Sequence, residues 1–545
     1  MIKRILIAAL FVITMACCSC KPKDGEYKVD IYAVSDIHGR FFSQSYTGGE
    51  DQLSLSNVSA FIKEMRKSNP DLILIDNGDH LQGDNAAFYF NYEEPRSPHI
   101  FPRIANYMKF DAVIVGNHDI EAGHPVYDRT RKEYKAPLLA ANVVDENGKP
   151  YFGEYTVLKR SGLKVAIIGM ITPRIKNWLP EEKYKGLDFL EAEGFAQNLV
   201  DRVIDKEKPD IVIIAIHAGT GDGTLDDVEN PALRIAENLR GVDLVISGHD
   251  HIANIVDPVN FHQKSMLMNS GARAQNVAKC EITLVYEGGR PVEKEIECSL
   301  IPMAGRPRDA EYDATFAADF EKVKAFTNKK VGTLTSDIDL NDVFDGPSAY
   351  VSLLHKVQLD ASGAQLSFAA PLGRTGVIKS GDILYNDLFS IYPYENMLYK
   401  IKLSGRQVKD YLEYVYDNWV NGRGPTYNLD SAAGINYKVY RNKPKGERVE
   451  IESLENGEPF DMDAEYTVAV TSYRAMGGGN LLSEGAGVDT SDESAYVVDI
   501  YEDIRDLIFK QLADNPVLDP AVRTNWSFVE KDAISQQIAD FFGVH

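Results

Sequence analysis

Short apolar runs that stop abruptly at polar residues constrain the fold of this chain more than any other feature. Residues 71–75 run into Asn77-Gly78-Asp79, and residues 112–115 run into Gly116-Asn117-His118. The same pattern recurs in three further runs, at residues 29–34, 211–216 and 242–246. Runs of this kind are typical of strands buried on both faces. Because segments with helical spacing of apolar residues separate them, the sequence predicts an α/β fold with mostly parallel strands.

The residues that follow these runs are of the types that bind metal ions. In chain order they are Asp36, His38, Asp79, Asn117, His118, His217, His249 and His251. The carboxyl ends of parallel strands meet at one edge of a sheet, so we expect these side chains on one rim. On extended backbone, residues two apart point the same way, which would bring Asp36 and His38 to one point. Five of the 11 histidines stand at these strand ends, a concentration not expected of purely structural histidines.

This mixture of carboxylate, amide and imidazole groups suits zinc, manganese or iron better than calcium. There are more candidate ligands than one tetrahedral ion takes, which favours two ions that share one aspartate. Two ions about 3.5 to 4 Å apart can hold a bridging hydroxide and stabilise an in-line displacement at phosphorus. The sequence therefore predicts a metallophosphoesterase that uses water as its nucleophile.

The same residues resemble, in order and spacing, the metal motifs of the calcineurin-like metallophosphoesterases. That resemblance implies a four-layer α-β-β-α domain over residues 27–300 with two metal sites. One ion would be held by Asp36, His38 and His251, the other by Asn117, His217 and His249, with Asp79 bridging them. His118 would stabilise the transition state or protonate the leaving oxygen. Related nucleotidases commonly carry Asp or Asn three residues after this histidine, whereas this chain has Glu121, which could still orient His118.

The second half of the chain, residues 331–545, follows a charged, helix-compatible connector at 301–330. Segments at 391–396 and 471–480 resemble the α+β C-terminal domain of the 5′-nucleotidase family. The resemblance implies four substrate-binding residues. Tyr394 and Tyr473 would sandwich the base, Asn396 would contact it, and Arg374 would meet the phosphate or ribose. Stacking between two rings accepts any base, because every base has a π-face.

Details of the C-terminal segments bear on the reaction. Ser472-Tyr473-Arg474 is similar to the 2′,3′-cyclic-nucleotide 2′-phosphodiesterase branch, and Gly479 stands where typical 5′-nucleotidases have an aspartate. The expected activity is that of a 5′-nucleotidase or a 2′,3′-cyclic-nucleotide 2′-phosphodiesterase/3′-nucleotidase, in nucleotide catabolism and salvage. Two alternatives stay open: a non-catalytic surface lipoprotein that captures nucleosides or metals, and a hydrolase of nucleotide-sugars or other esters.

The N-terminus, residues 1–20, is predicted to be an export signal, because two basic residues precede an apolar run at 5–15 that is too short to span a bilayer. Ala16 before Cys17 resembles a bacterial lipoprotein cleavage site; Cys18 and Cys20 are further candidates for the lipid, and a plain cleaved signal is the alternative. We expect the mature protein in the periplasm or at the cell surface, in contact with the membrane only through a lipid anchor.

The net charge of −23 argues against a large surface for a nucleic-acid backbone, which needs clustered lysine and arginine. The expected partner is a small nucleotide or nucleoside, bound by a monomer. Cys280 and Cys298 are the only cysteines beyond the signal, and they could form a disulfide or remain free thiols.

Overall fold

The computed structural model describes residues 22–46, 48, 51–177, 179–259, 262–340, 343, 346–372, 376–394, 396–421, 426–490 and 493–529. The predicted export signal and lipidation site, and the predicted substrate-binding residue Arg374, lie outside these residues. In the part of the chain that is described, no helix is long and apolar enough to cross a membrane.

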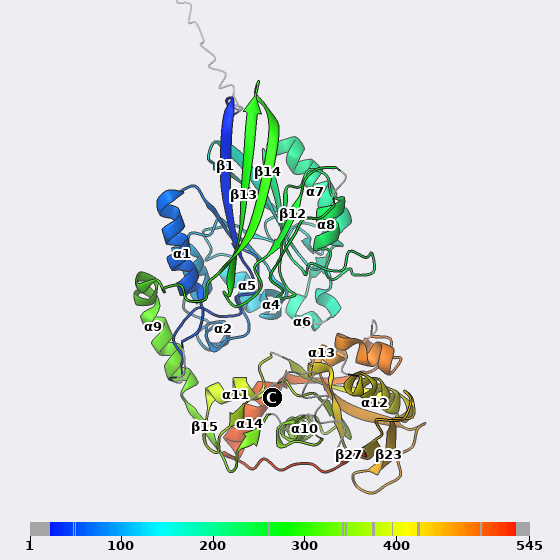
Figure 1. Cartoon of the computed structure of the whole chain (residues 1–545). Helices are drawn as coiled ribbons and strands as arrows, with labels where there is room; N and C mark the ends of the chain where they lie inside the picture. The colour runs from blue at the N-terminus through cyan, green and yellow to red at the C-terminus, as the bar shows by residue number, and fades with distance from the viewer. Residues whose placement is uncertain are drawn as a thin grey trace, which may run out of the picture.

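Two six-stranded sheets form the N-terminal domain (Figure 1). The first has the order β14 (Arg290–Pro302), β13 (Asn276–Glu287), β1 (Gly25–Val34), β2 (Ile73–Asp76), β3 (Ala112–Ile114) and β4 (Leu138–Leu139). The second has the order β11 (Asn254–Val256), β12 (Met266–Asn269), β10 (Leu244–Ser247), β9 (Ile211–His217), β7 (Leu163–Ile171) and β6 (Tyr155–Arg160). Strands β1 to β4 are parallel, as are β7, β9, β10 and β12.

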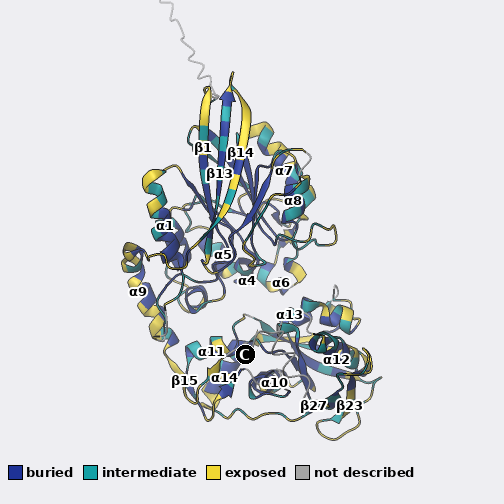
Figure 2. Ribbon diagram, viewed as in Figure 1, coloured by how far each residue is buried: buried dark blue, intermediate teal, exposed yellow. Residues whose placement is uncertain are grey.

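The inner faces of the two sheets form one hydrophobic core, to which Ile73 and Ile114 contribute from the first sheet and Ile167 and Ile213 from the second. Helices α1 (Leu55–Ser68), α3 (Ile100–Met108) and α9 (Ala310–Thr327) cover the first sheet, and α7 (Ala192–Glu207) and α8 (Ala232–Asn238) cover the second. In Figure 2 most strands of the sandwich are buried, the edge strand β14 is largely exposed, and α1 and α9 expose residues on their outer sides. The four-layer α-β-β-α architecture is therefore confirmed.

One detail of the sequence prediction is wrong. The ligand-bearing strands do not share one sheet: β1, β2 and β3 belong to the first sheet, whereas β9 and β10 belong to the second. A continuous apolar run shows that a strand is covered on both faces, but not whether a helix or another sheet covers it.

Helix α9 occupies most of the predicted connector. Asp309 caps its first turn by accepting hydrogen bonds from the backbone N–H groups of Glu311 and Tyr312. Tyr312 and Phe316 then pack into the N-terminal core, so the connector is anchored to the first domain before it enters the second (Figure 1).

The C-terminal domain contains a five-stranded mixed sheet in the order β21 (Ser431–Ala433), β17 (Leu366–Ala369), β24 (Glu465–Thr471), β20 (Met397–Ser404) and β25 (Val497–Asp503). A three-stranded sheet has the order β23 (Val449–Leu454), β22 (Ile435–Val439) and β27 (Trp526–Phe528), and another the order β19 (Gly381–Leu384), β15 (Lys330–Leu334) and β26 (Val517–Leu518). The helices of this domain include α10 (Ala349–Ser362), α11 (Tyr385–Ile391), α12 (Gly405–Val420), α13 (Ser472–Ala475) and α14 (Ile504–Asp514).

Phe88, the last residue of the short helix α2 (Asn85–Phe88), links the domains. It is buried in the aromatic core of the C-terminal domain, with its ring centroid 5.5 Å from that of Phe389 and 6.0 Å from that of Tyr385. Asn85 donates a hydrogen bond of 2.8 Å to the side chain of Asn386. The segment that follows Asp79 is thus attached directly to the second domain.

Cys280 and Cys298 face each other across the β13–β14 pairing, and both are free thiols.

Candidate metal centre

Five of the seven candidate metal ligands lie on tight turns that follow the strands, whereas His217 ends β9 and Asn117 begins the short helix after β3. Asp36, His38, Asp79, His249 and His251 all have positive φ, between 48° and 70°. Non-glycine residues in this left-handed region cost roughly 1 to 3 kcal/mol each and persist only where the surrounding structure holds them. The prediction of extended backbone for Asp36 and His38 is therefore wrong, although their side chains do converge. A left-handed turn, not strand alternation, brings them together.

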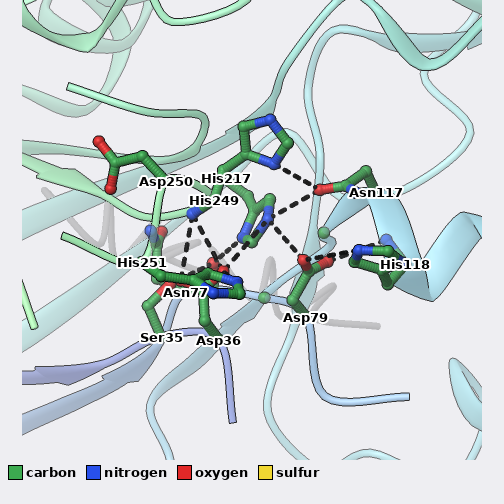
Figure 3. A network of polar contacts seen from close by, with 12 residues as sticks. Ser35, Asp36, Asn77, Asp79, Asn117, His118, His217, His249, Asp250 and His251 are labelled. Carbon is green, nitrogen blue, oxygen red and sulfur yellow. Dashed lines mark hydrogen bonds and ion pairs between the residues drawn. The ribbon is translucent and has the colours of Figure 1, made fainter. Parts of the chain in front are cut away.

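Two groups of side chains lie where each could hold a metal ion (Figure 3). In the first group, Nε2 of His251 is 3.4 Å from Oδ1 of Asp36 and 2.9 Å from Nε2 of His38. The second group consists of Asp79, His217 and His249.

Asn117 joins the second group. Its Oδ1 lies 3.0 Å from Nε2 of His217 and 2.9 Å from Nδ1 of His249. All seven predicted ligands thus lie in these two groups, and metal binding by them stays a prediction.

Asp79 stands between the two groups. Its Oδ2 is 3.1 Å from Nε2 of His217 and 3.9 Å from Nε2 of His38. This oxygen is buried, and no well-formed hydrogen bond reaches it from the described residues. Burial also raises the pKa of Asp36 to about 6, although His217 opposes the shift. Two buried carboxylates surrounded by imidazole nitrogens form a donor set that divalent transition metals fit.

The glycines of the motifs allow close backbone approach. A Cβ atom at Gly116 would overlap the Asp79 carboxylate, and one at Gly248 would overlap the Ser35 hydroxyl. Gly78 has φ +93°, and a Cβ there would lie 2.7 Å from Nδ1 of His217. Side chains at these positions would displace the candidate ligands.

His118 is the second residue of the short helix α4 (Asn117–Glu121) and lies beside Asp79. Its backbone N–H donates to Oδ1 of Asp79 at 2.9 Å, its Nδ1 is hydrogen-bonded to the Glu121 carboxylate, and its Nε2 lies 4.0 Å from Oδ2 of Asp79. Burial lowers the pKa of His118, but Asp79 and Glu121 outweigh burial and raise it to about 10. Glu121 therefore reaches the imidazole despite its extra methylene group, and together with Asp79 it favours the protonated form of His118.

Three supporting residues were not assigned from the sequence. Asp119 accepts four backbone hydrogen bonds, from Gly116, Asp79, His80 and Leu81. The carbonyl oxygen of Asn77 lies 2.7 Å from Nδ1 of His217, which leaves Nε2 of that ring facing the site. Oε1 of Glu229 lies 3.0 Å from Nε2 of His249. Asp119 and Asn77 stand inside motifs that were identified, whereas no pattern marks Glu229, in the loop between β9 and α8.

Three of the four predicted substrate-binding residues are described, all in the C-terminal domain. Tyr394 follows α11 and is 37% exposed. Asn396 accepts a 3.3 Å hydrogen bond from the Ser472 hydroxyl. Tyr473, in α13, packs edge-on against Tyr427 with ring centroids 6.1 Å apart.

Arg474 and Gly479 shape the surroundings of Tyr473. Arg474 forms a buried ion pair of 2.8 Å with Asp430, and its guanidinium lies 5.3 Å from the centre of the Tyr473 ring. Gly479 has φ +74°, and a Cβ there would meet Oδ1 of Asn428 at 2.5 Å. The Asn428 amide therefore occupies the space next to the glycine.

A four-layer sandwich with two such groups at the carboxyl ends of its strands defines a metallophosphoesterase. Residues 29–253 match the family described as calcineurin-like phosphoesterase, and residues 327–484 match the 5′-nucleotidase C-terminal domain. The chain therefore belongs to the 5′-nucleotidase family of calcineurin-like metallophosphoesterases, a family that needs divalent metals, and it is a phosphoric ester hydrolase.

Similar proteins include the trifunctional nucleotide phosphoesterase YfkN of Bacillus subtilis, 25% identical over 94% of this chain; the chain spans 40% of that protein's length. The 2′,3′-cyclic-nucleotide 2′-phosphodiesterase/3′-nucleotidase of Haemophilus influenzae is 25% identical over 87% of this chain and 84% of its own. Among solved structures, the fold is similar to that of a putative 5′-nucleotidase from Staphylococcus aureus, with a TM-score of 0.76, 21% identity, and coverage of 92% of this chain and 99% of that one.

Proposed function

We propose that this protein is an exported two-metal hydrolase of nucleotides, acting on 2′,3′-cyclic phosphodiesters and on 3′- or 5′-monoesters, in nucleotide catabolism and salvage. The observation that supports this proposal most is that Asp79 lies between the two groups of candidate metal ligands. The same chain carries a 5′-nucleotidase-type C-terminal domain, which contains Tyr394 and Tyr473. The export signal and lipid anchor rest on residues 1–20 alone.

Two divalent ions held by these groups would polarise the phosphoryl oxygens and lower the pKa of a water molecule that attacks phosphorus. The chain itself supplies proton transfer. A ribose oxygen is a poor leaving group unless it receives a proton as the bond to phosphorus breaks. The Glu121 carboxylate favours the protonated form of His118 and holds its Nδ1, so Nε2 is the nitrogen available to donate that proton.

The C-terminal domain would hold the nucleoside. Tyrosine rings can stack on any base, so Tyr394 and Tyr473 favour nucleotides without selecting one of them. The Bacillus relative is named a trifunctional nucleotide phosphoesterase, and the Haemophilus relative is named for both a phosphodiesterase and a nucleotidase activity. These names support a site that accepts both diesters and monoesters.

The first test is substrate profiling of the purified chain without residues 1–20, supplied with manganese or zinc. The substrates are 2′,3′-cyclic AMP, 3′-AMP, 5′-AMP and a nucleotide-sugar. We expect the cyclic and 3′ substrates to be cleaved fastest. Preference for the nucleotide-sugar would contradict the proposed substrate, and metal binding without turnover of any of the four would contradict the proposed reaction.

The role of His118 can be tested separately. His118→Asn should retain metal while turnover falls about 10²- to 10⁴-fold, the usual contribution of a general acid. His124→Asn is a matched control, because Nδ1 of His124 pairs with Asp128 at 3.1 Å in another part of the same domain. Equal effects of the two substitutions would overturn the assignment of His118.

A further inference from the structure

Cys280 and Cys298 lie directly opposite each other in the hairpin at the edge of the first sheet. The register of β13 and β14 pairs these two residues, and the register shift of this pairing lies between Val285 and Tyr286, away from both cysteines. Residues opposite each other in an antiparallel pair have Cα atoms about 4.5 or 5.5 Å apart. Both spacings fall within the range of about 4.4 to 6.8 Å that a disulfide spans. The backbone therefore brings the two residues within bonding reach.

The two side chains also point to the same face of the hairpin. Cys280 is fully buried in the core between the two sheets, and Cys298 packs against that core from the edge strand. Ile296 and Leu300, two residues to either side of Cys298, contact the same core, whereas Ser299 is exposed. Both thiols thus leave the sheet on its inner side, as a bond between neighbouring strands requires.

The two thiols differ in how easily an oxidant reaches them. Cys298 is partly exposed on β14, which is the edge strand of the first sheet. Cys280 is covered, and the neighbouring Cys298 thiol, followed by burial, raises the pKa of Cys280 well above its usual range. Because the thiolate is the attacking species in thiol–disulfide exchange, the reaction would begin at Cys298.

We propose that Cys280 and Cys298 are a modification site, at which exchange with a small-molecule or protein disulfide forms a cross-strand disulfide. The Cys298 thiolate attacks one sulfur of the donor, a mixed disulfide forms, and the other donor sulfur leaves as a thiolate. Cys280 then attacks the Cys298 sulfur, gives up its proton, and displaces the second donor sulfur. The protein loses two electrons and two protons, and the donor disulfide is reduced to two thiols. The predicted export would supply such donors, because compartments outside the cytoplasm are oxidising.

The bond would fasten the strand that leads to the second domain. β14 ends at Pro302, and α9, which forms most of the connector, begins at Ala310. An ion pair of 2.6 Å between Lys294 and Asp243 already ties the same strand to the start of β10 in the second sheet. A disulfide restricts the conformations of the unfolded chain, so it should stabilise the N-terminal domain.

The test measures cross-linking in the chain without residues 1–20, in which Cys280 and Cys298 are the only cysteines. The protein is incubated with oxidised glutathione or with dithiothreitol, alkylated, and digested with trypsin, which cuts after Lys294, between the two cysteines. We expect mass spectrometry to find the two peptides joined after oxidation and separately alkylated after reduction. Two alkylated peptides after oxidation, or glutathione attached to Cys298 without a cross-link, would overturn the proposal.

Thermal unfolding measures the consequence of the bond. The midpoint of unfolding should be about 5 °C higher for oxidised than for reduced protein. An equal midpoint for the two forms would overturn the stabilising role of the disulfide.

A matched variant moves one thiol to the other face of the strand. Cys298→Ser/Ser299→Cys keeps two cysteines, but position 299 is exposed and pairs with Lys279. This variant should not cross-link, and its unfolding midpoint should be the same with and without reductant. Cross-linking as complete as in wild type would show that the register does not direct the bond, and would overturn the proposal. Because neither measurement uses a nucleotide, failure of the nucleotidase proposal would leave the disulfide unaffected.

Discussion

At the scale of single residues, strained backbone and supporting carboxylates hold the candidate ligands in place. Five of the seven ligands have positive φ, and Asp119 satisfies four backbone N–H groups around Asp79 and Gly116. Supporting carboxylates of this kind orient ligands and raise their basicity. The ligands are thus positioned by the turns before any ion binds.

Glu229 tests this positioning. Glu229→Gln should weaken metal binding about 10- to 100-fold, because its carboxylate holds Nε2 of His249 while Nδ1 faces Asn117. Titration with a competing chelator would measure the affinity, and Glu321→Gln, at an exposed position of α9, is the control. Unchanged metal affinity in Glu229→Gln would show that the Glu229 carboxylate does not position His249 for metal binding.

His355 predicts a pH dependence of stability. It is buried between the hydroxyls of Ser367 and Ser431, at 3.0 and 3.1 Å, and burial lowers its pKa from 6.5 to about 3. The folded state keeps this histidine neutral while the unfolded state protonates it below pH 6.5. Its contribution is therefore complete above pH 6.5 and is lost as the pH falls toward 3, by about 1.4 kcal/mol per pH unit.

Denaturant unfolding followed through Trp419 and Trp526, both in the C-terminal domain, measures this slope. His355→Gln should unfold with a flatter pH dependence between pH 6 and about 4 than wild type. Parallel curves for the two proteins would show that His355 does not carry the effect.

At the scale of elements, the N-terminus of α14 supports the segment that carries Tyr394 and Asn396, two of the predicted base-contacting residues. Arg505, only 1% exposed, donates from Nε to the carbonyl oxygen of Tyr392 at 3.1 Å and from Nη2 to that of Tyr394 at 2.8 Å. The backbone N–H of Ile504 donates to the carbonyl oxygen of Asn396 at 2.9 Å. The Arg505 guanidinium also stacks 3.9 Å from the centre of the Phe389 ring. One helix start therefore fixes three carbonyl groups around Tyr394.

Replacing Arg505 by lysine should disturb this segment while it keeps the charge. Lysine lacks the forked guanidinium group that reaches two carbonyl groups, so KM for nucleotides should rise. The loss of binding free energy should not exceed that of one stacked base, about 1 to 3 kcal/mol. KM for p-nitrophenyl phosphate, which has no base, should change less, and the exposed Arg406→Lys should have no effect. A similar rise for both substrates would place the defect in the metal centre instead.

Element-level patterns also mark the limit of what the sequence predicts. Apolar runs and their polar ends predicted the strands and the convergence of Asp36, Asp79 and His217. The same runs did not reveal the second sheet, because a strand buried on both faces has the same apolar sequence whether a helix or another sheet covers it. Left-handed turns at Asp36 and His38 were not foreseen, since positive φ is uncommon outside glycine, even though aspartate and histidine adopt it more often than most residues. Long-range contacts such as Glu229 with His249 leave no local signal at all.

At the scale of the whole molecule, the chemistry and the predicted nucleoside contacts lie on different domains. The two groups of candidate metal ligands lie at the carboxyl ends of strands from both sheets. Tyr394 and Tyr473 lie in the second domain, which follows α9 in the chain. Phe88 joins the two, since it follows the Asp79 turn by nine residues and is buried among aromatic residues of the C-terminal domain. The negative charge of the chain makes local positive charge, from metal ions and arginines, necessary for any anionic substrate.

The most direct measurement of the central claim is metal content together with activity, for wild type and Asp79→Asn, after loading with manganese or zinc and removal of free metal. The shared position of Asp79 predicts two ions per chain in wild type, and joint loss of bound metal and nucleotide hydrolysis in Asp79→Asn. Asp360→Asn, an exposed partner of Lys356 on α10, should behave as wild type. One ion per chain in active wild type, or an Asp79→Asn enzyme that keeps both ions and full turnover, would contradict the two-metal site.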